Sequence, residues 1–142
     1  MNPIRVLIVD DHPVVRTGLR GMFETDPGFD VAGEAGDGAA AVELVGSVHP
    51  DVVLMDLQMP GVGGVEAITR IRSLPSPPPV LVLTVYDSDV QILRAIEAGA
   101  SGYLLKDSPL GELLRAVRAA ANVLERVQPI VIVEGIGHGR QG

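Results

Sequence analysis

Residues 52–61 read Val-Val-Leu-Met-Asp-Leu-Gln-Met-Pro-Gly, and this stretch decides the fold. Its apolar run is typical of a β-strand buried on both faces, and the run stops at one carboxylate, Asp56. A glycine-rich turn follows, so Asp56 is also explained as a cap of that turn. Three other apolar runs end in residues that suit one shared chemistry, which favours a functional interpretation of Asp56.

The composition bounds the class of protein. The 142 residues fit one domain, and 46% of them are apolar, which is enough for a sizeable core. The absence of cysteine excludes disulfides and thiolate metal sites, and the net charge of -7 opposes direct binding of nucleic acid. No apolar run approaches the ~20 residues of a membrane helix, and the N-terminus has no signal-peptide pattern. We therefore expect a soluble, cytoplasmic protein without a membrane partner.

Five apolar runs alternate with five helical patterns along the chain. This alternation predicts an α/β fold with a doubly wound parallel sheet. We expect helix N-caps at Asp37 and at Asp87 or Ser88, and a helix C-cap at Gly99. The expected strands are 4–9, 29–35, 52–56, 80–84 and 103–105, and the expected helices are 13–25, 41–48, 65–71, 90–97 and 110–124.

Four of the apolar runs end in polar residues. Asp10 and Asp11 follow the first strand, and Asp56, Thr84 and Lys106 lie at the ends of the third, fourth and fifth. In a doubly wound sheet the carboxyl ends of the strands share one edge, where ligands bind. We call these five the rim residues and expect their side chains to converge.

The rim residues suit phosphate chemistry. Ionised carboxylates repel by about 4 kcal/mol per pair at ~4 Å and an effective dielectric of about 20, so the rim must protonate a carboxyl group or hold a cation. An oxygen-only site suits Mg²⁺, which shares itself with a phosphate. Lys106 then serves as a point charge on a phosphoryl oxygen, and Thr84 donates a hydrogen bond to another. Asp56 is left as the nucleophile.

Lys106 is the only lysine among the 11 Lys and Arg residues. A surface lysine at a strand end is common, but arginine replaces a compact point charge poorly, so this choice favours function. Tyr103 is expected to face away from the rim as a half-buried strand aromatic. His12 is expected to be solvated rather than metal-bound, although it lies within reach of the rim.

The sequence resembles the receiver domain of two-component response regulators over about residues 4–124. The resemblance rests on Asp10-Asp11, the loop Asp56-Leu57-Gln58-Met59-Pro60, Thr84 and Lys106. Residues 9–12 (Val-Asp-Asp-His) and 102–107 (Gly-Tyr-Leu-Leu-Lys-Asp) are most similar to the NarL/FixJ, or LuxR-type, subfamily. The resemblance implies a flavodoxin-like sheet of five parallel strands in the order 2-1-3-4-5, with five helices.

The resemblance also implies the chemistry of the acidic residues. Asp56 accepts a phosphoryl group from a sensor histidine kinase. Asp11, Asp56 and the backbone carbonyl of Gln58 bind Mg²⁺ directly, and Asp10 acts mainly through water. The protein then catalyses its own phosphorylation and dephosphorylation without being a conventional enzyme, and it needs no organic cofactor.

The resemblance assigns the remaining rim residues to binding and switching. Thr84 and Lys106 bind the phosphoryl group. Thr84 and Tyr103 couple phosphorylation to an output surface on the fourth helix, fifth strand and fifth helix. The resemblance is also compatible with a homodimer.

The resemblance divides the chain into a receiver domain, 1–124, and a C-terminal tail or linker remnant, 125–142, expected to be partly disordered. Members of the subfamily usually carry a helix-turn-helix domain after a linker, and this tail is too short for one. DNA binding and transcription regulation are therefore expected only from a longer protein. The alternative is a stand-alone receiver that acts through protein contacts.

Three other functions fit less well. A haloacid-dehalogenase-type phosphatase needs a second Asp two residues after its nucleophile, but His12 follows Asp10 and Gln58 follows Asp56. A flavin binder needs stacking aromatics, and the chain has no tryptophan and only two residues each of tyrosine and phenylalanine. A degenerate receiver used only for binding is expected to lack part of the motif, which is complete here.

Overall fold

The sheet of this computed structural model has six parallel strands in the order β2-β1-β3-β4-β5-β6. The structure describes residues 2–84, 89–122 and 131–132. The strands are β1 (Ile4–Val9), β2 (Phe29–Ala35), β3 (Val52–Asp56), β4 (Val80–Thr84), β5 (Gly102–Leu105) and β6 (Val131–Ile132). The predicted order of the first five strands is confirmed.

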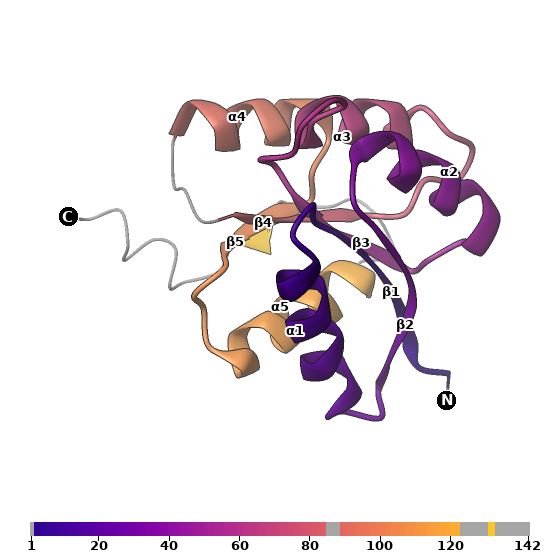
Figure 1. The fold of residues 1–142 in the computed structure, drawn as a ribbon, viewed down its shortest axis with the longest axis vertical. Coiled ribbons are helices and arrows are strands. Elements are labelled where there is room, and N and C mark those ends of the chain that lie inside the picture. Colours follow the sequence, from indigo (N-terminus) through magenta and orange to yellow (C-terminus); the bar gives the residue numbers. More distant parts are fainter. Residues whose placement is uncertain (1, 85–88, 123–130, 133–142) are drawn as a thin grey trace.

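Five helices cover the sheet on two sides (Figure 1). The helices α2, α3 and α4 lie above the sheet in that view, and α1 and α5 lie below it. Their bounds are α1 (Pro13–Glu24), α2 (Gly38–Val48), α3 (Gly64–Arg72), α4 (Asp89–Ala98) and α5 (Leu110–Ala121). This two-sided cover explains why the central strands β3 and β4 are nearly continuous apolar runs, since both of their faces are buried.

The central strands form the core. All five residues of β3 and all five of β4 are buried, including the polar residues Asp56 and Thr84 at their ends. Phe23 of α1 and Ile68 of α3 are fully covered on opposite sides of this sheet. The core therefore extends right up to the carboxyl edge, and polar groups placed there are held among packed neighbours.

Local signals in the sequence account for several helix ends. Pro13 is the first residue of α1, and the Asp37 carboxylate caps α2 by accepting from the Ala40 backbone N–H at 2.8 Å, as predicted. The predicted C-cap at Gly99 is also confirmed. Its φ is +117°, its N–H donates to Ile96, and the Ala100 N–H donates to Ala95 in a Schellman arrangement. The predicted cap at 87 or 88 lies outside the described residues.

The strand β6 adds to the prediction of five strands. Val131 pairs with Gly102 and Ile132 pairs with Tyr103, in parallel register along β5. Both residues belong to the apolar part of the segment that we expected to form the tail. Within the described chain, β5 therefore has a partner on each side.

Two glycines allow close approach of the loop that follows β3. The Gly38 N–H donates to the Val62 carbonyl, and a Cβ on Gly38 would lie 2.5 Å from that oxygen. A Cβ on Gly64 would lie 2.6 Å from the Asp56 carbonyl oxygen. The start of α3 is thus packed directly against the backbone of Asp56, and the start of α2 is packed against Val62 in the loop that follows.

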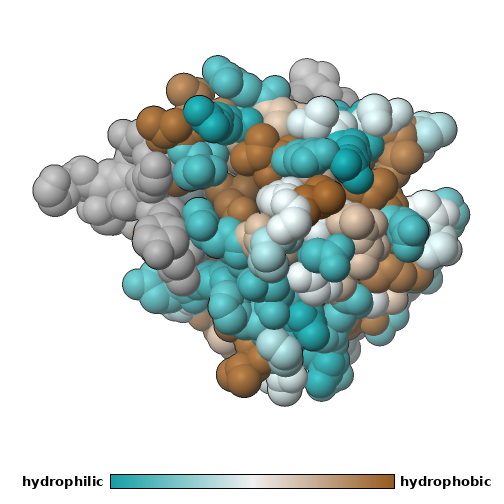
Figure 2. All heavy atoms as spheres, turned by 45° about the horizontal axis from the view of Figure 1, so that its top comes forward, coloured by the Kyte–Doolittle hydropathy of each residue, from teal (hydrophilic) through white to brown (hydrophobic). Residues whose placement is uncertain are grey.

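The surface carries several exposed apolar side chains. Val90 and Leu93 of α4 are 59% and 56% exposed, and Val14 of α1 is 83% exposed. Figure 2 shows apolar atoms interrupting the hydrophilic surface at the upper left, the side on which Figure 1 places α4. Among the described residues, no helix has the length and apolar character required to cross a bilayer.

Candidate functional site

Three rim residues converge at the carboxyl ends of β1, β3 and β5. The Lys106 Nζ lies 2.6 Å from Oδ2 of Asp10 and 3.5 Å from Oδ2 of Asp56. Asp10 and Asp56 are 1% and 2% exposed, and the Lys106 side chain is 15% exposed. The expected convergence of a lysine with two carboxylates is therefore present in the structure.

Asp11 and His12 complete the acidic side of the rim. The His12 Nδ1 lies 3.0 Å from Oδ1 of Asp10 and 3.1 Å from Oδ1 of Asp11. Its backbone N–H also donates to Oδ1 of Asp10 at 2.9 Å. His12 is largely exposed, as expected, but its ring nitrogen contacts both carboxylates rather than water alone.

The buried carboxylates titrate in opposite directions. Burial pushes the pKa of Asp10 upward, but hydrogen bonds from Lys106 and His12 outweigh it, so this pKa lies below its usual value. Burial raises the pKa of Asp56, the Asp10 charge adds to the rise, and Lys106 opposes it only in part. Of the two carboxyl groups, Asp10 therefore favours its ionised form. Asp56 is the group whose ionised form an added positive charge stabilises most.

The acidic side has the donor set for a hard cation. Oδ2 of Asp10, Oδ1 of Asp11 and Oδ2 of Asp56 are buried carboxylate oxygens. The Lys106 ammonium faces the first and the third of them, and Nδ1 of His12 lies 3.1 Å from the second. One ligand atom from each of Asp10, Asp11, His12 and Asp56 lies within 4.8 Å of the others. Carboxylate oxygens with open coordination fit Mg²⁺.

Thr84 and Tyr103 share one face of the sheet. Thr84 pairs with Leu105 and Val82 pairs with Tyr103, and alternate residues of a strand point to the same side. Thr84 is 1% exposed, and its carbonyl accepts the Lys106 backbone N–H at 2.8 Å. Tyr103 is 7% exposed, so it is more deeply buried than the half-buried aromatic that we expected.

Gln58 is close to the site through its backbone. Its N–H donates to Oδ1 of Asp56 at 3.2 Å, while its side chain is exposed. This bond holds one oxygen of Asp56 and leaves the other facing Lys106. The predicted ligand, the carbonyl of Gln58, belongs to the same short loop.

Sequence reasoning missed Arg16, which contacts the acidic loop, and Glu34, which contacts Arg16. The Arg16 Nη1 donates to the backbone carbonyl of Asp10 at 2.6 Å, and its Nε lies 3.4 Å from Oε1 of Glu34. A charged residue on the half-buried side of α1, one turn after His12, was the available signal.

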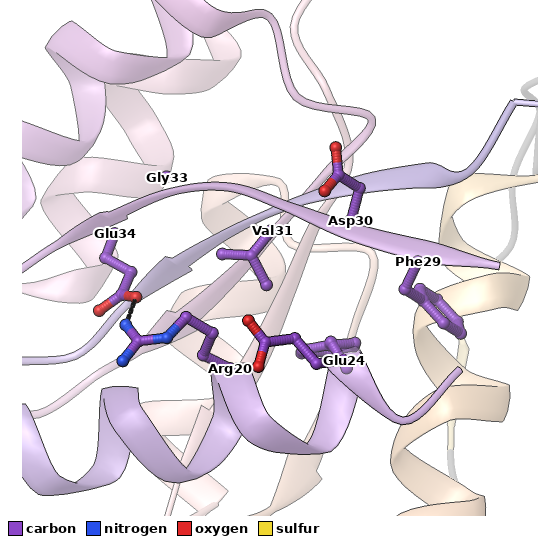
Figure 3. Close-up of a pocket in the computed structure, with 8 residues that line it drawn as sticks. Arg20, Glu24, Phe29, Asp30, Val31, Gly33 and Glu34 are labelled. Atoms are coloured by element: carbon purple, nitrogen blue, oxygen red, sulfur yellow. Dashed lines mark hydrogen bonds and ion pairs between the residues drawn. The ribbon is translucent and has the colours of Figure 1, made fainter. Parts of the chain in front are cut away.

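A hollow of about 310 Å³ between α1 and β2 contains none of the rim residues. In Figure 3, Arg20 of α1 bonds Glu34 of β2 at one side of this hollow, and Asp30 points away from it. The hollow therefore does not mark the predicted chemistry; its lining residue Glu34 contacts Arg16, which in turn bonds the Asp10 carbonyl.

Comparison with known proteins agrees with the architecture of the rim. The family model of the response regulator receiver domain matches residues 6–118. The chain belongs to the response regulator receiver family. Receiver domains generally bind Mg²⁺, and the acidic cluster of this receiver domain fits that ion.

The relatives place this receiver domain in the NarL/LuxR group. The nitrate/nitrite response regulator protein NarP of Escherichia coli (strain K12) is 45% identical over 84% of this chain and 55% of NarP. The receiver domain of the response regulator NarL from Mycobacterium tuberculosis is 39% identical, with a TM-score of 0.82 over 85% of this chain and 98% of that one. A LuxR-family response regulator from Aurantimonas sp. SI85-9A1 is 37% identical, with a TM-score of 0.86 over 96% and 94%.

These similarities confirm the family and subfamily expected from the sequence motifs. The chain spans about half the length of the curated relatives it matches. The two solved chains, by contrast, are matched over 98% and 94% of their own length.

Proposed function

We propose that Asp56 of this receiver domain accepts a phosphoryl group from the phosphohistidine of a sensor kinase. A carboxylate oxygen of Asp56 attacks phosphorus, a P–O bond forms, the P–N bond breaks, and the departing imidazole takes up a proton. The supporting observation is the cluster of buried carboxylate oxygens from Asp10, Asp11 and Asp56, two of which face the single lysine. The haloacid-dehalogenase alternative has no comparable support, since Gln58 stands where that chemistry needs an aspartate.

Each rim residue has a part in this transfer. Asp10, Asp11, Asp56 and the Gln58 carbonyl hold Mg²⁺, which neutralises the carboxylates and the phosphoryl oxygens when it is bound. Lys106 is close enough to Asp56 to bond a phosphoryl oxygen attached there. The Gln58 N–H orients the Asp56 carboxylate, so the attacking group is held before the donor arrives.

The site is tested by phosphorylation with acetyl phosphate and Mg²⁺, followed by localisation of the modified residue by mass spectrometry. We expect one phosphoryl group on Asp56, none on Asp56→Asn, and none with EDTA. Asp51→Asn is the matched control, because Asp51 precedes the same strand at its opposite end and is exposed. Full labelling of Asp56→Asn would overturn the assignment.

The output of the domain is proposed to be a change in association. A phosphoryl group on Asp56 offers new oxygens to the Thr84 hydroxyl, and Tyr103 lies on the same face of the sheet as Thr84. A small shift of both can select between two arrangements of the surface formed by α4, β5 and α5. In a longer protein with a helix-turn-helix domain, this change regulates DNA binding and transcription.

The switch is tested by sedimentation and amide exchange with and without a beryllofluoride mimic of the phosphoryl group. We expect altered association of the wild type, with altered exchange across 89–122, and a smaller change in Thr84→Ala. An unchanged wild type in both measurements would overturn the proposed switch. An undiminished change in Thr84→Ala would remove Thr84 from it.

A further inference from the structure

The two peptide units on either side of Asp10 are held by different elements, the first by β2 and the second, which leads to Asp11, by α1. The Asp10 N–H donates to the Ala35 carbonyl at 3.0 Å, and the Asp10 carbonyl accepts from Nη1 of Arg16 at 2.6 Å. A peptide unit is planar, so a fixed carbonyl fixes the orientation of the whole unit. The contact with Arg16 therefore holds the backbone unit that links the two residues whose carboxylates face the rim.

Arg16 is itself anchored, which makes the contact directional. Its Nε faces Oε1 of Glu34 at 3.4 Å, and Arg20 bonds the other oxygen of Glu34. Figure 3 shows the second of these contacts, with Glu34 reaching from β2 toward α1. The side chains of Arg16 and Glu34 are 22% and 23% exposed, so this network is mostly shielded from solvent.

The space around the Arg16 guanidinium is restricted as well. A Cβ on Gly36 would lie 3.3 Å from Nη1 of Arg16, which is tighter than ordinary van der Waals contact. The guanidinium thus sits between the carbonyl of Asp10, the carboxylate of Glu34 and the backbone of Gly36. A planar fork can bond two partners at once, which a lysine ammonium on a flexible stem cannot reproduce.

We infer that Arg16, oriented by Glu34, is a positioning residue that presents Asp10 and Asp11 to the divalent cation. The inference rests on the proposed function, since it concerns the metal used in phosphorylation. Within the described residues, Arg16 does not contact the carboxylate oxygens of Asp10 or Asp11. Its effect passes through the backbone carbonyl of Asp10. Groups that orient metal ligands in this way contribute roughly 10- to 100-fold to metal affinity in proteins.

The test compares Arg16→Ala with Arg20→Ala in the full chain. Both substitutions remove one arginine from α1 and one contact with Glu34, but only Arg16 contacts Asp10. Mg²⁺ alone is titrated and followed by the amide chemical shifts of the rim, which measures affinity without phosphorylation. We expect about tenfold weaker Mg²⁺ binding for Arg16→Ala, and a change below about twofold for Arg20→Ala.

Acetyl phosphate supplies a second readout. The Mg²⁺ concentration for half-maximal phosphorylation should rise about tenfold in Arg16→Ala, while the rate at saturating Mg²⁺ stays within about twofold of wild type. Arg16→Lys keeps the charge and should recover less than half of the lost affinity on a logarithmic scale. A mere loss of stability would not separate half-saturation from the maximal rate.

Each outcome decides the inference. Equal Mg²⁺ affinities for folded Arg16→Ala and Arg20→Ala would overturn it, and so would full recovery by Arg16→Lys. If Arg16→Ala does not fold, Glu34→Gln retains Arg16 and should weaken Mg²⁺ binding several-fold more than Arg20→Ala, and equality would again overturn the inference. A wild type that binds Mg²⁺ but is not phosphorylated would overturn only the proposed function.

Discussion

The ammonium of Lys106 lies 2.6 Å from Oδ2 of Asp10, closer than its 3.5 Å distance to Asp56. Without a bound cation, Lys106 therefore pairs mainly with the carboxylate of Asp10 in the acidic loop. Positive charge entering that loop competes for the same oxygen. We therefore expect metal binding at the rim to release Lys106 toward Asp56.

Lys106→Ala should destabilise the metal-free protein by roughly 2 kcal/mol at pH 7, because it leaves the buried Asp10 carboxylate without its cation. The pKa of Asp10 lies below the usual value of 3.8, so its contribution to stability is present above that pH and is lost as pH falls through the lowered pKa. The deficit should therefore shrink in acid. Urea unfolding in EDTA measures it.

Arg70→Ala is the control for this substitution. It removes a cation from an exposed pair with Glu66 and should change stability by less than about 0.5 kcal/mol. Equal stability of Lys106→Ala and wild type at pH 7 would contradict the role assigned to the lysine.

Asp56→Asn should stabilise the metal-free protein at neutral pH by roughly 1 kcal/mol. Burial raises the pKa of Asp56 above the usual 3.8, so the folded state binds a proton more readily than the unfolded chain. Wild-type stability then falls as pH rises through that window, and the asparagine variant escapes the fall. Unfolding in EDTA from pH 4 to 7.5 should show the two curves diverging; a variant less stable than wild type at pH 7 would refute this.

Mg²⁺ should stabilise the fold through the acidic loop. A single site at a hundredfold excess over its dissociation constant adds about 2.7 kcal/mol. Thermal melts with and without Mg²⁺ should show this increment in wild type and its near absence in Asp11→Asn. An identical increment in both proteins would place the ion elsewhere.

Two glycines of α2 offer opposite outcomes for the same substitution. Gly38→Ala should cost at least about 2 kcal/mol, since its Cβ would lie 2.5 Å from the Val62 carbonyl oxygen. Gly46→Ala meets no atom within 4 Å and should stabilise by about 0.5–1 kcal/mol, as alanine does within a helix. Urea unfolding of both variants decides the matter, and equal effects would show that the loop contact is not tight.

The central strands were predictable because β3 and β4 are apolar runs buried along their whole length and bounded by turn residues. The bounds of β1 and β2 agree with the prediction to the residue. The convergence of Asp10, Asp56 and Lys106 was predictable too, since parallel strands place their carboxyl ends at one edge.

The remaining features depend on contacts between distant segments. The place of Arg16 one turn after His12 is only a weak local signal, and its role appears only when Glu34 and Asp10 lie on either side of it. The pairing of Val131–Ile132 with β5 depends on the path of the chain after α5. The contact of His12 with both carboxylates depends on the turn between β1 and α1.

The glycine at the start of α3 has a consequence for how this domain tolerates change. Any side chain at Gly64 would collide with the backbone of Asp56 and Leu57, with contacts of 2.6 and 2.7 Å. In a scan of every single substitution, replacements of Gly64 should therefore abolish function as completely as replacements of Asp56, although Gly64 carries no reactive group. The positions that tolerate no replacement would then include residues whose part is to leave room for the backbone, as well as those that carry the chemistry.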